Sequence, residues 1–545
     1  MTAAALRPAA RPVRREGGLT GTARLLTLWL RRDRVMVPSW IYGLTALVAG
    51  TVYSFKNEYD TPEALASFAR GINGNPSTRA MYGPVLNPGT VGGLSAWRVG
   101  AVGAALTAVM CVLLVVRHTR AEEESGRLEL VGAAAVGRRA PLTAALLTAG
   151  TAAAVLAAVA AAVMVLFGMP VAGSVAFGLS WFGAGAVFAG VAAVTAQLAE
   201  TSRLANGLAF AVLGAAYLLR GIADAGSAHW VAWLSPIGWA QRVRPCADEQ
   251  WAVLLLPLAA TAALVAVAYA LTERRDLGAG ILAPSLGPAA AAPSLRSPLA
   301  LAWRLQRGAL LGWAAAFGIY GFAIGGVADG VGDLVNGSEA VLDDIRKLGG
   351  GGDLADAFLA TAMSLMALFT AAYAVQTVVR MRAEESAGRL EPLLATAVGR
   401  VRWAVANLAV TVAGTAVLLL LSGFTAGLVH GARTGDVDGR LVRQLGAALA
   451  QLPSVWVIAA VAFLLFAALP RATSAGWGVL AACLLLGQVG PLLDLPQGVL
   501  DVSPFTHTPK LPGGDFAATP LAVLTAVAAA VTAAGLLALR RRDIA

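Results

Sequence analysis

The chain contains little charge. Of its 545 residues only 13% are Asp, Glu, Lys or Arg, while 58% are hydrophobic. Soluble domains carry about 25% charged residues. This shortage excludes an ordinary soluble domain and predicts an integral membrane protein.

Lysine, histidine and cysteine are also scarce. The three lysines are Lys56, Lys347 and Lys510, and none belongs to a Gly-x-x-x-x-Gly-Lys-[Ser/Thr] phosphate loop. The four histidines show no metal-ligand spacing with cysteines or acids. The three cysteines show no paired spacing, so no disulfide framework is expected. These absences predict a chain that is not an enzyme and that holds no metal or cofactor of its own.

Long apolar runs are abundant instead. About 17 or more apolar residues can cross the hydrocarbon core of a membrane as a helix. We count twelve such runs, six on each side of a linker near 272–307. They lie near 35–55, 94–116, 142–169, 171–198, 204–223 and 251–271, and near 308–328, 357–379, 402–430, 451–469, 474–494 and 518–540. The predicted fold is therefore all-α, with about twelve transmembrane helices.

The basic residues indicate the orientation. An even number of spans places both termini on one side. Most of the 41 Lys and Arg then fall in segments on that side, whereas acids are more numerous on the other. Because Lys and Arg concentrate in cytoplasmic loops, both termini are expected in the cytoplasm of a multi-pass plasma-membrane protein. The net charge of +10 thus reflects topology and does not indicate nucleic-acid binding.

One charged stretch occurs twice. Residues 120–138 and 382–400 are identical at 13 of 19 aligned positions. We call them the first and second repeated loops. Each lies between the second and third span of its half, on the predicted cytoplasmic side. A loop that only separates two spans would not explain why identity is concentrated here, so both loops are expected to contact the same kind of partner.

The repeated loops are expected to be partly helical. In a helix, Glu123 would pair with Arg127, and Glu385 with Arg389, at the favourable i,i+4 spacing. The glycine before each arginine should end the first helical segment. A short second segment should follow it.

Weaker correspondences extend the repeat over the whole chain. Leu-Ser-Pro-Ile at 234–237 matches Val-Ser-Pro-Phe at 502–505, and Arg-Arg-Asp-Leu at 274–277 matches Arg-Arg-Asp-Ile at 541–544. Their common order predicts two parallel six-helix repeats. The expected domains are a basic arm with an elbow helix (1–34), a first half (35–277), a linker with a second elbow helix (278–307) and a second half (308–545).

The elbow helices are predicted from short apolar runs flanked by arginines, at 25–30 and 299–305. Such amphipathic segments lie in the membrane interface. They could be simple juxtamembrane anchors or elbow helices that move with their half, and we favour the second reading.

The external loop at 329–356 is acidic and glycine-rich. It could attract cationic substrates, but a solvated surface is the interpretation we favour.

Ionisable side chains are nearly absent from the interior of the predicted spans. Arg98 and Arg220 lie at the external edges, and the polar exceptions are neutral. Proton-driven transporters usually hold ionisable groups within the membrane. The pattern favours a transporter whose energy source lies outside this chain.

The motif Glu-Glu-x-x-Gly-Arg-Leu-Glu, followed by Val-Gly-Arg, resembles the cytoplasmic coupling loop of ATP-binding-cassette (ABC) export permeases. Among these the chain looks like actinobacterial exporters of polyketide antibiotics, in which two six-span halves are fused. The resemblance implies a permease that moves a hydrophobic or amphipathic, drug-like compound out of the cell. It gives the chain a role in multidrug efflux, antibiotic export or antibiotic resistance.

The resemblance also implies a separate ATPase subunit, in two copies, which binds ATP and Mg and docks on the two loops through their coupling helices. The residues that match the motif are Glu122, Glu123, Gly126, Arg127, Glu129 and Arg138 in the first loop, and Glu384, Glu385, Gly388, Arg389, Glu391 and Arg400 in the second. No residue is singled out as a substrate contact.

The alternative is a proton- or ion-coupled multidrug facilitator built from two parallel six-span repeats. That family should show intramembrane acids and a Gly-x-x-x-Asp-Arg-x-Gly-Arg-like loop after its second span. This chain has Glu-Glu-x-x-Gly-Arg-Leu-Glu at that place, which favours the ABC permease.

Overall fold

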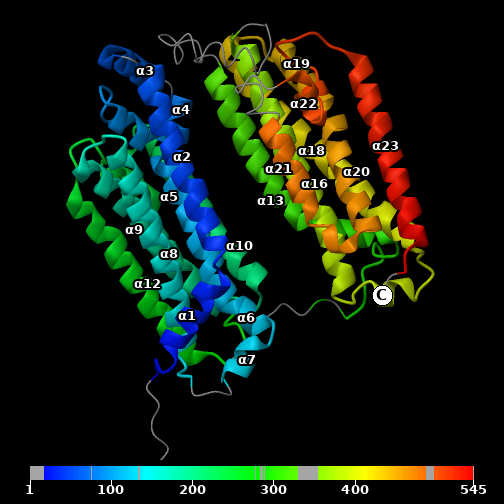
Figure 1. The fold of residues 1–545 in the computed structure, drawn as a ribbon, viewed down its shortest axis with the longest axis horizontal. Coiled ribbons are helices and arrows are strands. Elements are labelled where there is room, and N and C mark those ends of the chain that lie inside the picture. Colours follow the sequence, from blue (N-terminus) through cyan, green and yellow to red (C-terminus); the bar gives the residue numbers. More distant parts are fainter. Residues whose placement is uncertain are drawn as a thin grey trace, which may run out of the picture. The chain divides into compact units, whose positions relative to one another are not determined.

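The computed structural model describes residues 18–543, apart from 60, 75, 133–135, 277, 283–286, 288, 329–353 and 487–495. Every regular element within these residues is a helix. The chain divides into two compact units, Met1–Leu286 and Gly287–Ala545 (Figure 1). Each unit is described by itself.

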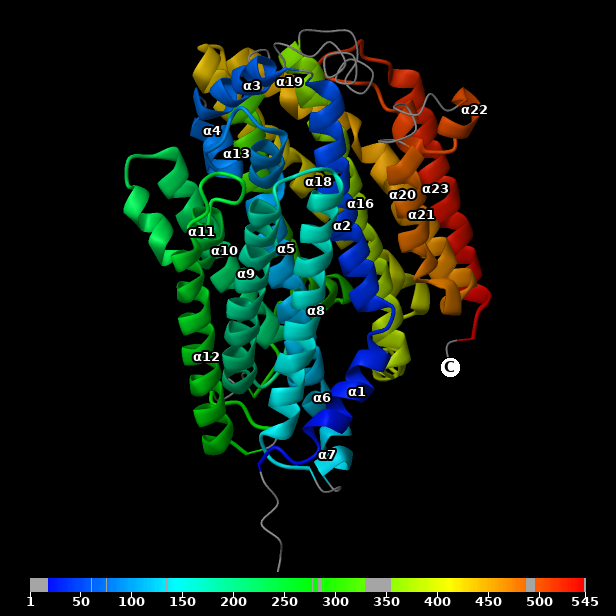
Figure 2. The same cartoon turned by 60° about the vertical axis from the view of Figure 1, so that its left-hand side comes forward.

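Unit 1 contains most of its residues in long helices that run side by side (Figure 2). Its elements are α1 (Thr22–Arg32), α2 (Met36–Glu58), α3 (Pro62–Gly74), α4 (Pro76–Tyr82), α5 (Val91–His118), α6 (Arg120–Glu124), α7 (Arg127–Gly132), α8 (Ala140–Leu166), α9 (Val171–Leu198), α10 (Ser202–Ala225), η1 (His229–Leu234), α11 (Pro236–Arg242), η2 (Trp251–Leu254) and α12 (Leu255–Arg274).

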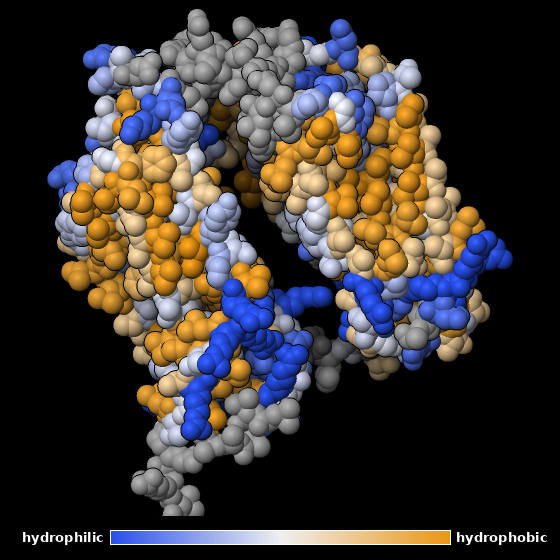
Figure 3. Space-filling model, viewed as in Figure 1, coloured by the Kyte–Doolittle hydropathy of each residue, from blue (hydrophilic) through white to orange (hydrophobic). Residues whose placement is uncertain are grey.

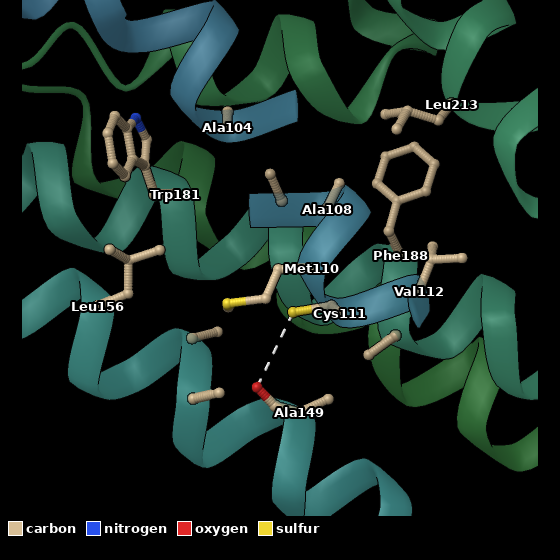
Figure 4. Close-up of a cluster of buried hydrophobic side chains, with 14 of the residues drawn as sticks. Ala104, Ala108, Met110, Cys111, Val112, Ala149, Leu156, Trp181, Phe188 and Leu213 are labelled. Atoms are coloured by element: carbon tan, nitrogen blue, oxygen red, sulfur yellow. Dashed lines mark hydrogen bonds between the residues drawn. The ribbon is translucent and has the colours of Figure 1, made fainter. Parts of the chain in front are cut away.

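Helices α5 and α9 form the centre of unit 1, and small residues allow them to pack closely. A Cβ atom built on Gly103 of α5 would lie 1.8 Å from the Trp181 ring of α9. Gly178 of α9 faces the backbone of α8 in the same way, at Ala157. Such close contacts between small residues are typical of helices that associate in membranes. Figure 4 shows the resulting core, to which Trp181 and Phe188 of α9 and Ala104 and Ala108 of α5 belong.

Unit 2 is also helical throughout its described elements. They are α13 (Pro298–Val327), α16 (Leu354–Ser386), α17 (Glu391–Leu394), α18 (Arg400–Thr434), α19 (Val437–Ala450), α20 (Leu452–Ala468), η4 (Pro470–Ala472), α21 (Ala475–Leu484), α22 (Gln497–Leu500), η6 (Pro504–His507) and α23 (Ala518–Arg541). Gly321 and Gly325 of α13 approach the α18 backbone at Ser422 and Ala426, so this pair also packs through small residues.

Eleven helices of the described residues are long and apolar enough to cross a membrane. In Figure 3 hydrophobic residues cover much of the visible flank of each unit. This confirms an all-α membrane protein. The twelfth expected span, 474–494, begins with the short apolar helix α21, but 487–495 lie outside the described residues. The twelve-span repeat and the domain boundaries therefore stay predictions.

The two predicted elbow helices differ. In unit 1, α1 is a separate helix, which ends where the buried carboxylate of Asp33 accepts a hydrogen bond from His118 and lies 3.4 Å from Arg117. In unit 2, residues 299–305 belong to the continuous helix α13. A separate second elbow was therefore wrong, because the helix that begins at Pro298 continues without a break to Val327. Residues 329–353 of the predicted acidic external loop (329–356) lie outside the described residues.

Candidate functional site

Both repeated loops bend at their glycine, as predicted. Gly126 and Gly388 have φ angles of +71° and +67°, a left-handed conformation that only glycine adopts readily. The bend ends α6 and α16, and the short helices α7 and α17 follow. Leu128 and Leu390, two residues after each glycine, are buried and fix the second segment to its unit.

The expected i,i+4 ion pairs are wrong. Arg127 lies 3.6 Å from Glu122, and Arg389 lies 3.7 Å from Glu384, so each arginine faces the first glutamate of its motif. The left-handed glycine takes the chain off the helical path, which removes the i,i+4 geometry. Glu123 is consequently free to bond elsewhere.

Glu123 binds the arginine that ends the last span of unit 1. Arg275 donates from Nη1 to Oε2 of Glu123 at 2.8 Å and from Nη2 to Oε1 at 2.5 Å. Arg138, at the far end of the loop, donates from Nη2 to the Arg275 carbonyl oxygen at 2.7 Å. We call Glu123, Arg138 and Arg275 the first closing cluster. It joins both ends of the first repeated loop to one residue.

Unit 2 contains the same arrangement. Arg542 donates from Nη2 to Oε1 of Glu385, and Arg400 donates from Nη1 to the Arg542 carbonyl oxygen at 2.5 Å. Glu385, Arg400 and Arg542 form the second closing cluster. Arg542 also donates to the Phe466 carbonyl oxygen at 2.6 Å. The same residues of the repeat thus make the same contacts in both units.

The carboxylates of the closing clusters are shielded from solvent. The side chains of Glu123 and Glu385 are 6% and 3% exposed. Charge-assisted hydrogen bonds are strong, and removal of one partner leaves a buried charge without compensation, at a cost of about 3–5 kcal/mol. The closing clusters therefore hold each loop in one conformation.

Glu123 has a second partner that is fully buried and hydrogen-bonded, whereas the second partner of Glu385 is more exposed and more distant. Arg120 is fully buried and donates to Glu123 Oε2 at 2.6 Å and to the Ala279 carbonyl oxygen at 2.8 Å. The corresponding residue, Arg382, is 32% exposed and lies 3.3 Å from Glu385.

The first repeated loop also bonds to neighbouring helices. Glu122 accepts a hydrogen bond from Arg32 of α1. Glu124 accepts from the backbone N and Oγ of Ser202, at 3.0 and 2.6 Å, where α10 begins. His118 stacks on Trp29 of α1, with 4.6 Å between ring centroids. These contacts tie the loop to α1 and α10.

The arginine and the last glutamate of each motif face solvent. The side chains of Arg127 and Arg389 are 59% and 61% exposed, and Glu129 and Glu391 are exposed. The predicted coupling residues therefore separate into two groups. Glu122, Glu123, Arg138, Glu384, Glu385 and Arg400 bond within their own unit, while Arg127, Glu129, Arg389 and Glu391 are accessible to another molecule.

Sequence reasoning missed the partners of the buried group. Arg275 and Arg542 belong to the repeated Arg-Arg-Asp sequence, which was recognised as a sign of duplication and not as part of a site. Its repetition beside the same span end was the available signal. Arg120 begins the repeated stretch 120–138 but was given no role, and Arg32 and Ser202 carried no such signal.

Nothing in the described part of the chain points to a metal centre, since no three His, Cys, Asp or Glu side chains come together there. Arg139, beside the first closing cluster, bonds to Glu273, and this hydrogen bond raises the pKa of Arg139. A cavity of about 390 Å³ lies against this cluster, between Leu128, Gln197 and Asp276. Within the described residues the site thus consists of buried ion pairs and an exposed charged surface.

Two comparisons with known proteins agree with this picture. The family described as multidrug efflux system permease Rv1217c, C-terminal domain, matches residues 23–271 and 295–540, so one matched segment lies in each half. The chain is also 45% identical to the multidrug efflux system permease protein Rv1217c of Mycobacterium tuberculosis (strain ATCC 25618 / H37Rv), over 99% of this chain and 98% of that protein.

Proposed function

The chain belongs to the family of the multidrug efflux system permease Rv1217c, and from this we propose that it is the membrane subunit of an ABC exporter. It moves a hydrophobic or amphipathic, drug-like compound out of the cell. The energy comes from a separate ATPase, which binds ATP and Mg and docks on the repeated loops. In this proposal the loops and both termini are cytoplasmic and the protein lies in the plasma membrane.

The observation that carries the proposal is the equivalence of the two loops. Each closing cluster fixes a loop from within, and each loop then exposes the same arginine and glutamate to solvent, on either side of a buried leucine. A rigid, charged surface presented twice suits two copies of one partner. A loop that only connects two spans would not need its ends joined by a buried ion pair.

The spans offer little to support the facilitator alternative. A proton relay needs ionisable groups within the membrane. Arg220 and Asp224, near the end of α10, lie 3.5 Å apart as an ion pair, and Arg220 also donates to the carbonyl oxygens of Ala80 and Met81. Their bonds join α10 to α4, which gives them a structural role at the edge of the span.

The two docking surfaces differ in detail. Glu124, Ser125 and Leu130 of the first loop correspond to Ser386, Ala387 and Pro392 of the second. We propose that both loops bind the ATPase through the shared residues, and that the differing residues set how strongly each loop couples.

The test is purification of the tagged chain from its native membranes, with and without Glu129→Ala and Glu391→Ala together. Both residues are exposed and outside the closing clusters, so the fold should persist. We expect an ATPase to co-purify with the wild type and to be lost, or no longer stimulated by substrate, in the double variant.

The matched control is Glu63→Ala with Asp438→Ala, which removes two exposed acids at the opposite ends of the units. It should retain the ATPase. If the wild type purifies without an ATPase and moves substrate in response to a proton gradient alone, the proposal fails and the facilitator takes its place.

A further inference from the structure

Unit 1 contains a cavity of about 360 Å³ at the end away from the first repeated loop. Helix α10 begins at the loop, where Ser202 bonds to Glu124, and the cavity lies at its other end, beside Asp224. The start of α5 and helix α11 form its other walls. Its volume is within the range of small-molecule sites, about 300–1,000 Å³.

The charged residues that line the cavity leave positive charge uncompensated. Asp224 is paired with Arg220, which is fully buried. The remaining lining charges are Arg242 and Arg244. Arg244 is exposed and forms no ion pair with any residue that the structure describes. A carboxylate, sulfonate or phosphate is the group that such arginines recognise.

Arg242 has an unused donor. Its Nη2 donates to the His229 carbonyl oxygen at 2.7 Å, and its guanidinium lies 4.6 Å from the Trp233 ring centroid. Its Nε is buried and finds no acceptor among the described residues. A buried N–H group without an acceptor is uncommon in folded proteins and is usually satisfied by water or a ligand.

Part of the remaining lining is apolar, and the rest includes Asn87, Ser180 and Gln241. The ring of Trp97, which is fixed by a 2.6 Å hydrogen bond from Nε1 to the Gly83 carbonyl oxygen, forms part of the lining together with Pro84, Ala96 and Ala101. An occupant that satisfies both kinds of wall carries one acidic group on an apolar body.

The loop that carries Arg244 is held in an unfavourable conformation. Arg244, Cys246 and Asp248 have φ angles of 54°, 58° and 62°. Non-glycine residues adopt this region when the surroundings impose it, and such residues cluster at ligand sites. Asn87 donates from Nδ2 to the Cys246 carbonyl oxygen at 2.6 Å and holds the loop against the cavity.

We infer that this cavity is a binding site for an amphipathic organic anion, whose acidic group is bound by Arg242 and Arg244 and whose apolar body lies against Trp97. The inference does not depend on the ATPase. The same chemistry is offered by a free compound and by an anionic lipid headgroup with its chains.

The probe is 11-(dansylamino)undecanoic acid, a fluorescent anionic amphiphile, with its neutral methyl ester as the comparison. The full-length wild type in phosphatidylcholine nanodiscs should bind the acid at least 10-fold more tightly than the ester. Arg242→Gln with Arg244→Gln should weaken binding of the acid at least 10-fold and leave the ester unchanged. Arg70→Gln, an exposed arginine on α3, is the control and should change neither affinity.

A second variant tests the cavity without altering charge. Gly100 lines the cavity, and a Cβ atom built on it meets nothing within 4 Å. Gly100→Leu should therefore fill the space and abolish binding of both probes. Gly150→Leu, in α8 with equally open surroundings, is the matched control.

Phosphatidylglycerol added to the nanodiscs identifies the source of the anion. Displacement of the probe by this lipid assigns the site to a lipid headgroup, and displacement by soluble dodecyl sulfate alone assigns it to a free compound. The inference is overturned if acid and ester bind equally, or if folded Arg242/Arg244 and Gly100 variants bind the acid like the wild type.

Discussion

The two repeated loops share their closing clusters and differ in almost everything around them. The first loop is bonded to α1 through Arg32 and to α10 through Ser202. In the second, the ion pairs of Glu384 with described residues are those to Arg380 and Arg389, at 3.8 and 3.7 Å. The comparison separates two kinds of feature. Both copies have a closed loop with an exposed arginine and glutamate, whereas the bonds to neighbouring helices through Arg32 and Ser202 belong to unit 1.

The largest expected effect comes from removing the arginine of a closing cluster. Arg542→Ala leaves Glu385 with only the half-exposed Arg382 and should lower the free energy of local opening by about 3 kcal/mol. Arg275→Ala should cost less, because Arg120 still bonds to Glu123. Hydrogen exchange of peptides from 382–400 and 120–138 measures both. Equal losses would show that Arg120 does not compensate.

A smaller effect is expected at the two left-handed glycines. Gly126→Ala and Gly388→Ala should each cost about 1–2 kcal/mol, because an L side chain is disfavoured at positive φ. A Cβ atom at either position meets nothing within 4 Å, so no clash adds to this cost. Thermal unfolding of each variant is the measurement. The asparagine variants, which tolerate this conformation better, should be closer to the wild type.

The first glutamate of the motif should stabilise the preceding helix in unit 1 and not in unit 2. Glu122→Ala removes the partner of Arg32. It should lower the free energy of local opening of residues 22–32, measured by hydrogen exchange, by about 1 kcal/mol, a small value because Arg32 is 35% exposed. Glu384→Ala should leave the start of α13, residues 298–307, unchanged. Increased exchange at 298–307 would contradict the difference between the units.

The smallest effect is expected where the sequences differ. Glu124→Ala removes two hydrogen bonds to Ser202. It should lower the free energy of local opening at the start of α10 by roughly 0.5 kcal/mol, since the contact is exposed. Ser386→Ala should have no measurable effect, because its hydroxyl bonds only to Ala383 of its own helix. Exchange rates at 202–206 provide the comparison.

The sequence predicted much of the fold because the relevant signals are local. Apolar length predicts the spans, and a glycine between two charged segments predicts the bend. The closing clusters could not be predicted in this way, since Glu123 and Arg275 are 152 residues apart and Glu385 and Arg542 are 157 apart. Only packing of the last span against the loop decides that pairing.

The i,i+4 pairs were predicted wrongly because local spacing does not show where the helix ends. Helical spacing assumes that the helix continues through Arg127, but the left-handed Gly126 ends it first. The separate α1 was predicted and the continuous α13 was not, because the difference depends on Asp33, whose burial against His118 is a tertiary contact.

The closing clusters also impose an order on biosynthesis. A ribosome that has just made Glu123 must add 152 more residues before Arg275 exists, and the chain folds from its amino-terminal side as it emerges. Each repeated loop therefore stays open until the final helix of its own unit has been made, so the first loop closes while the second unit is still being synthesised.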